Sequence, residues 1–82
     1  MNIQNIVETQ LRLAIAEHSS VPVEFDNESY LDEFQLDSVA FTAMLVQLEA
    51  KIGFIPDSML SGIEYPETVG ELVEMYQRQA MD

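Results

Sequence analysis

Apolar residues recur at helical spacing in three stretches of the chain. A spacing of three and four residues places side chains on one face of a helix. The first stretch predicts a helix from about residue 3 to about residue 17, with its apolar stripe formed by Ile3, Ile6, Val7, Leu11, Ala14 and Ile15. The second predicts a helix that begins at Ser38 and carries Phe41, Met44, Leu45, Leu48 and Ile52.

Glycine and proline residues mark the ends of these segments. Gly53 is suited to end the second helix in a left-handed conformation, and Pro56 prevents its continuation. Thr68 and Glu71 form an S/T-x-x-E capping box, which predicts a last helix with Val69, Leu72, Val73, Tyr76 and Ala80 at helical spacing. Residues 57–60 fit either a short helix that ends near Gly62 or a turn.

Residues 19–37 show no such periodicity and predict a long loop. Loops of this length are unusual in a small domain, which favours a function for the loop or a short helical turn inside it. We expect its apolar residues to hold it against the core: Val23, Phe25, Tyr30, Leu31, Phe34 and Leu36. The predicted fold is all-α: one domain over residues 1–82, with three main helices, one short helix and a long loop between the first two main helices.

The charge of the chain limits the classes of molecule that it can bind. It has 82 residues, 15 acidic and 3 basic, with a net charge of −12, and 48% of its residues are hydrophobic. The apolar content is high enough for a packed core, so the charge belongs to the surface. Such a surface repels nucleic acids and anionic membranes and favours partner proteins with basic patches.

Composition also bears on the compartment. There is no cysteine, hence no disulfide or thiolate site. The first residues lack the basic start and apolar stretch of a signal peptide, and no segment approaches about 18 consecutive apolar residues. We expect a soluble, cytoplasmic and monomeric protein.

Asp37 and Ser38 stand where the acidic loop meets the second helix. Both are common at helix starts, because a side-chain oxygen satisfies a free backbone amide. A hydroxyl at this position is also a favourable place for a phosphate ester. A catalytic serine is not indicated, because nothing in the sequence places the lone histidine, His18, beside Ser38.

Three motifs in order resemble the acyl carrier protein family. The stretch 36–39, Leu-Asp-Ser-Val, resembles the family's attachment motif. The stretch 48–57 resembles the segment after its second helix, and 65–72, with Thr68-Val69, resembles the turn into its last helix. The resemblance covers the chain from about Phe34 to the end of the last helix, with compatible spacing before it.

This resemblance implies a carrier protein, not an enzyme. A phosphopantetheinyl transferase would attach 4'-phosphopantetheine from coenzyme A to Ser38, with Asp37 as part of the attachment motif. The arm would hold acyl or aminoacyl groups as thioesters and present them to loading and transfer enzymes. The alternative from the residues alone is an unmodified acidic helical module that binds a partner through the second helix.

Two departures from the family pattern favour a specialised pathway. Gln35 stands where carriers of fatty-acid synthesis usually have glycine, and residues 39–48 contain no acid. An aminoacyl carrier, similar to D-alanyl carrier proteins, or a polyketide carrier fits better than a general fatty-acid one. We expect partner docking at Val39, Phe41, Met44, Asp32 and Glu33, and the family's acyl cavity implies walls at Phe41, Met44, Leu45, Met59 and Ile63.

Metal binding is not expected. Asp26, Glu28 and Asp32 are oxygen ligands that suit calcium, but the loop lacks the glycine and the regular spacing of an EF-hand. A solvated run of charges is the simpler interpretation.

Overall fold

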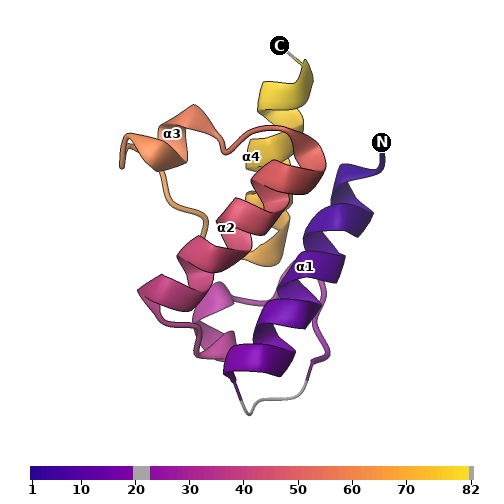
Figure 1. Ribbon diagram of the computed structural model, residues 1–82, viewed down its shortest axis with the longest axis vertical. Coiled ribbons are helices and arrows are strands. Elements are labelled where there is room, and N and C mark those ends of the chain that lie inside the picture. The colour runs from indigo at the N-terminus through magenta and orange to yellow at the C-terminus, as the bar shows by residue number, and fades with distance from the viewer. Residues whose placement is uncertain (20–22, 82) are drawn as a thin grey trace.

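The helices begin and end where the apolar pattern predicts. A computed structural model describes residues 1–19 and 23–81; residues 20–22, part of the expected loop, lie outside the described residues. The chain forms α1 (Ile3–His18), a 3-10 turn η1 (Leu31–Phe34), α2 (Ser38–Ile52), α3 (Asp57–Leu60) and α4 (Val69–Met81) (Figure 1). The all-α prediction is confirmed, and α3 is a short helix.

Side chains and glycine close the helix ends. Asn2 caps α1 by accepting a hydrogen bond from the Asn5 amide at 3.0 Å. Gly53 ends α2 with a φ of 111°, a conformation that glycine adopts without steric cost. Thr68 Oγ1 accepts from the Glu71 amide at 3.1 Å, but the Glu71 carboxylate accepts from the Glu67 amide at 2.6 Å rather than from Thr68. The cap therefore extends one residue further back than a capping box.

The core lies between α1, α2 and α4. In Figure 1, α1 and α2 run side by side with α4 behind them, and α3 lies off to one side, where a loop leads to it from the end of α2. Buried apolar side chains from each element fill the space between them: Val7, Leu11, Ala14, Ile15, Phe34, Met44, Leu48, Ile52, Met59, Val69, Leu72, Val73, Met75 and Tyr76. Burial of these side chains is the main source of stability in a domain of this size.

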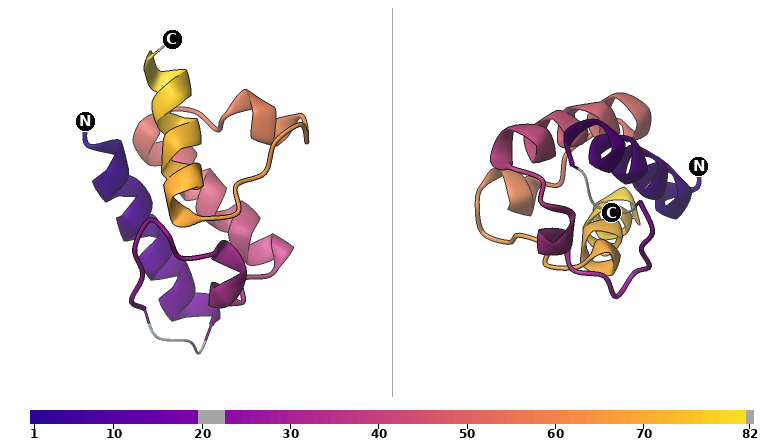
Figure 2. Two further views of the ribbon diagram at one scale, coloured as in Figure 1. Left: turned by 180° about the vertical axis from the view of Figure 1, so that it is seen from behind. Right: turned by 90° about the horizontal axis from the view of Figure 1, so that it is seen from below.

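Backbone hydrogen bonds fix the long loop to the start of α4. The amides of Val69 and Gly70 donate to the carbonyls of Ser29 and Asn27 at 3.0 and 2.9 Å. The Leu31 amide donates to the Glu67 carbonyl at 2.8 Å, and Tyr30 and Thr68 form an isolated antiparallel bridge. Figure 2 shows the loop and η1 passing close to the start of α4. The loop carbonyls thus satisfy helix amides that have no partner within α4.

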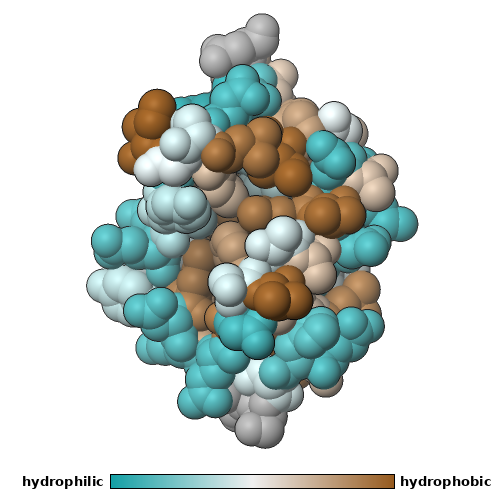
Figure 3. Space-filling view, turned by 60° about the vertical axis from the view of Figure 1, so that its left-hand side comes forward, coloured by the Kyte–Doolittle hydropathy of each residue, from teal (hydrophilic) through white to brown (hydrophobic). Residues whose placement is uncertain are grey.

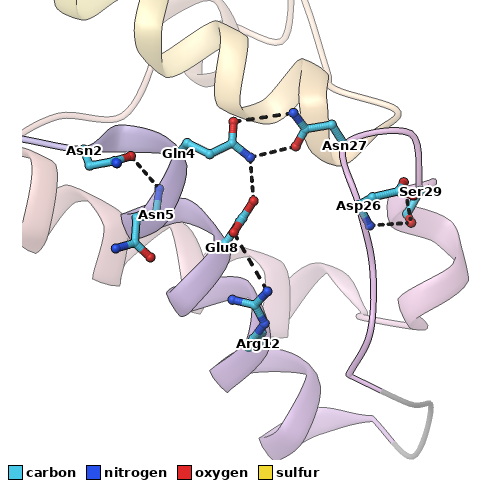
Figure 4. A network of polar contacts seen from close by, with 8 residues as sticks. All are labelled: Asn2, Gln4, Asn5, Glu8, Arg12, Asp26, Asn27 and Ser29. Carbon is cyan, nitrogen blue, oxygen red and sulfur yellow. Dashed lines mark hydrogen bonds and ion pairs between the residues drawn. The ribbon is translucent and has the colours of Figure 1, made fainter.

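Side chains join the same loop to α1 (Figure 4). The Gln4 amide donates to Glu8 at 2.6 Å and to Asn27 at 2.7 Å. The Arg12 guanidinium lies 3.8 Å from the Glu8 carboxylate and 5.0 Å from the centre of the Phe25 ring. One of the three cations of the chain is therefore used to hold the loop.

The loop's apolar residues do not all contribute to the core. Phe34 is buried and packs on the Phe25 ring, with ring centres 5.4 Å apart. Val23, Leu31 and Leu36 are partly buried against the core. The expectation for Tyr30 is wrong: its side chain is 55% exposed, because it is the backbone of Tyr30 that pairs with Thr68.

Candidate functional site

Ser38 is exposed at the first residue of α2. Asp37 is the residue before the helix, and its carboxylate accepts a hydrogen bond from the Ala40 amide at 2.7 Å, while its carbonyl accepts from Phe41 at 2.9 Å. The Ser38 hydroxyl makes no hydrogen bond to the described residues. Asp37 therefore caps the helix, and the cap does not use the neighbouring Ser38 hydroxyl.

Gln35 shapes the approach to this site. Its φ of 57° and ψ of 33° place it in the left-handed region, and among the described residues it is the one non-glycine with a positive φ. The Gln35 amide donates to the Asp32 carbonyl at 3.2 Å, which closes η1 and turns the chain toward Asp37. A left-handed residue here explains why glycine suits the position, because glycine carries no Cβ to clash.

A hollow of about 250 Å³ lies beside Ser38. Its walls come from η1, the segment before α2, the first turn of α2 and the segment before α4: Leu31, Asp32, Leu36, Asp37, Ser38, Phe41, Tyr65 and Pro66. Most of the wall is apolar, with Asp32 and Asp37 as its charged members. The structure thus brings together the predicted Asp32, Asp37, Ser38 and Phe41.

Leu31, Leu36, Tyr65 and Pro66 were not among the predicted site residues. Leu31 was expected only to hold the loop to the core, and Leu36 to do the same besides opening the stretch 36–39. Tyr65 is 66% exposed, and no spacing rule links it to Ser38. Tyr65 lies at the site because the Leu31 amide bonds to the Glu67 carbonyl. A backbone contact of this kind cannot be predicted from the sequence.

The residues expected to dock a partner differ in exposure. Val39 is 76% exposed and Phe41 partly buried, while Asp32 and Glu33 are exposed on η1. Met44 is 3% exposed, so its expected place on the docking surface is wrong. It shares the inward stripe of α2 with Leu48 and Ile52, and it fills the core instead of meeting a partner.

The residues expected to form the walls of an acyl cavity also differ in exposure. Met44 and Met59 are in the core, whereas Ile63 is 83% exposed after α3. Figure 3 shows brown apolar groups among hydrophilic ones on the face that carries α3 and the start of α2. Leu60 and Val46 are further exposed apolar side chains of α3 and α2. This face is therefore of mixed apolar and hydrophilic character.

One buried polar group stands out in the core. Tyr76 is 0% exposed, and its hydroxyl has no hydrogen-bond partner among the described residues. Burial, and to a lesser degree the negative charge of Glu49, raises the pKa of this hydroxyl above its ordinary value of 10.0. Its ring packs on Phe54, with ring centres 5.6 Å apart.

Two further expectations concern the loop acids and His18. The Asp26 carboxylate accepts from the Glu28 amide at 2.9 Å and so forms part of a turn. Within residues 1–19 and 23–81, no group of three or more acidic or histidine side chains is placed to hold a metal ion. His18 lies at the end of α1, 3.6 Å from Glu17.

Comparisons with known proteins give no relative of this chain. No protein-family model, curated protein or solved structure matches it significantly. Across the part of the chain that the structure describes, no helix has the length and apolar character needed to cross a membrane.

Proposed function

We propose that this protein is a carrier whose Ser38 bears a 4'-phosphopantetheine arm. The observation that carries the proposal is the exposed Ser38 hydroxyl at the start of a long helix, directly after a capping aspartate and beside a mostly apolar hollow. The resemblance of residues 36–39, 48–57 and 65–72 to acyl carrier proteins supports it.

The residues at Ser38 fit such a group. The amides of Ser38 and Val39 occupy the first two positions of α2 and have no acceptor among the described residues, whereas Asp37 already satisfies Ala40. Free amides at a helix start stabilise a nearby phosphate oxygen. Ser38 would hold the group through its Oγ, with these two amides next to the phosphate.

The arm supplies the thiol that the cysteine-free chain lacks, and it carries acyl or aminoacyl cargo as a thioester. The chain's own part is to present the arm and to dock enzymes in turn, so the carrier catalyses no step itself. Tethering keeps the cargo at a high effective concentration for each docked enzyme.

The exposed residues of this surface favour binding of partner proteins that have basic patches and apolar centres. Asp32 and Glu33 are exposed on η1, and Val39 is exposed next to Ser38. Complementary charge speeds encounter with a transferase or a loading enzyme. The α2 face from residue 39 to residue 48 has no acid, which favours a specialised aminoacyl or polyketide pathway in the cytoplasm over general fatty-acid synthesis.

A transfer reaction tests the proposal. A phosphopantetheinyl transferase of broad specificity is incubated with coenzyme A, Mg²⁺ and the chain, and intact mass is measured. We expect one arm on the wild type and none on Ser38→Ala. Ser58→Ala serves as the matched control, because Ser58 also lies near the start of a helix, α3, and this variant should accept the arm as the wild type does.

Two results would contradict the carrier. The wild type could remain unmodified, or Ser38→Ala could still gain the arm. An unmodified wild type would favour the alternative, an acidic interaction module that uses the exposed apolar residues Val39 and Val46 of α2.

A further inference from the structure

The hollow beside Ser38 has walls that are fixed in place by the fold. Leu31 belongs to η1, Phe41 to the first turn of α2, and Tyr65 to the segment before α4. The Leu31 amide is bonded to the Glu67 carbonyl at 2.8 Å, and the pairing of Tyr30 with Thr68 lies next to it. The walls formed by Leu31 and by Tyr65 are therefore held to each other, and the hollow does not depend on a ligand to form.

The size and chemistry of the hollow limit what it can hold. Its volume is about 250 Å³, which is below the range of roughly 300–1,000 Å³ that pockets for whole drug-sized ligands span. Leu31, Leu36, Phe41 and Tyr65 offer apolar contact, while the carboxylates of Asp32 and Asp37 disfavour an anion inside it. A small, apolar and uncharged group fits these walls best.

Ser38 itself forms part of the wall, so a group attached to its hydroxyl begins at the edge of the hollow. In phosphopantetheine, the phosphate ester oxygen is followed by one methylene and then by a carbon that bears two methyl groups. The phosphate can face solvent and the free amides of Ser38 and Val39, while the dimethyl carbon, only a few bonds further along the arm, can turn toward the apolar wall.

We infer that the hollow holds the dimethyl segment of the arm on Ser38, with Phe41 and Tyr65 packed against the two methyl groups. This inference rests on the proposed function and adds a positioning site for the root of the arm. Contact at the root restricts the directions in which the arm leaves the protein, whereas its thiol end stays free to reach partner enzymes. Each restricted bond lowers the entropy that a docked enzyme must remove.

Nuclear magnetic resonance of the loaded protein tests the inference. The arm is attached enzymatically, and intact mass confirms that attachment is complete. We expect nuclear Overhauser effects between the methyl protons of the arm and the ring protons of Tyr65 and Phe41. We also expect the two methyl groups to have separate chemical shifts that differ from those of free pantetheine.

Variants at Tyr65 separate packing from folding. Tyr65 is 66% exposed, so Tyr65→Ala should fold, and Tyr65→Phe keeps the ring. In Tyr65→Ala the methyl shifts should move toward the values of free pantetheine, while Tyr65→Phe should retain the wild-type shifts. Ile63→Ala is the matched control, because Ile63 is an exposed apolar neighbour that does not line the hollow.

The outcomes distinguish this inference from the proposed function. If the wild type gains the arm but its methyl groups show no contact with Tyr65 or Phe41, the arm root is free and the inference fails while the carrier stands. Equal changes in Tyr65→Ala and Ile63→Ala would also overturn it. If no arm is added to the wild type, the carrier proposal fails, and the inference fails with it.

Discussion

At the scale of single residues, Tyr76 is the least expected feature of the core. Its position on the inward stripe of α4 follows from the apolar spacing of the sequence, and its burial is complete. The fate of its hydroxyl does not follow from the spacing, because the presence of an acceptor depends on how α4 packs on the residues around Glu49 and Phe54. A buried hydroxyl without a partner costs stability.

Replacement of Tyr76 by phenylalanine should therefore stabilise the protein. Removing the unsatisfied hydroxyl while keeping the ring should raise the free energy of unfolding by about 1 kcal/mol. Urea unfolding at neutral pH measures this difference. A loss of stability of similar size would show that the hydroxyl has a partner in solution.

The same residue gives a dependence on pH. Because the pKa of Tyr76 is raised in the folded protein above 10.0, the unfolded chain loses this proton first as pH rises. The unfolded state then binds fewer protons, so the free energy of unfolding does not change through Tyr76 below pH 10.0 and falls as pH rises above it. The fall above pH 10.0 should be smaller in Tyr76→Phe than in the wild type, when both are unfolded by urea across this range.

At the scale of elements, the helices could be predicted from the sequence and the contacts between loop and helix could not. Apolar spacing and the residues Gly53 and Thr68 were sufficient to place α1, α2 and α4, because these signals are local. The pairing of Asn27, Ser29 and Leu31 with the segment 67–70 uses backbone groups, which every residue possesses. This pairing creates the hollow beside Ser38, so the hollow could not be predicted from the sequence either.

Met44 shows a second limit at this scale. The sequence placed it both on the apolar stripe of α2 and on the docking surface, and only the packed structure decides between the two. Val39 lies outside that stripe and is exposed, whereas Met44 is buried within the core. The start of α2 was predictable from the sequence, because Asp37 and Ser38 are adjacent and both lie at this helix start.

Gly70 tests how closely the loop packs on α4. A Cβ at this position would lie 3.0 Å from the Asn27 carbonyl oxygen and 3.2 Å from the Asn27 Cβ. Gly70→Ala should destabilise the protein by about 1 kcal/mol, because this clash exceeds the gain in helix propensity. Urea unfolding measures the change, and hydrogen exchange of the Val69 and residue 70 amides should accelerate.

Gln77→Ala in the same helix is the control, since Gln77 is exposed and the change alters helix propensity alone. If Gly70→Ala were as stable as Gln77→Ala, the loop would be able to move away from α4 without cost.

At the scale of the whole molecule, charge repulsion opposes folding. The chain has 15 acids against three cations, two of which are already engaged, Arg12 with Glu8 and Arg78 with Glu64 at 3.0 Å. Salt screens such repulsion, since the screening length is about 10 Å at 0.1 M. The melting temperature should rise from low to physiological ionic strength, as followed by circular dichroism.

A charge-reduced variant controls for other effects of salt. Asp32→Asn combined with Glu33→Gln removes two exposed charges, and its melting temperature should rise less with salt than that of the wild type. A melting temperature that stays flat or falls in the wild type would show that repulsion does not limit this fold.

The acidic surface and the exposed Ser38 both support the proposal that Ser38 carries a prosthetic arm. Fragmentation mass spectrometry of the transferase-treated wild type tests this most directly, because it locates the added mass on the chain. We expect the added mass on fragments that contain Ser38 and on no fragment that lacks it. Added mass on Ser58, Ser61 or any other serine, or none at all, would contradict it.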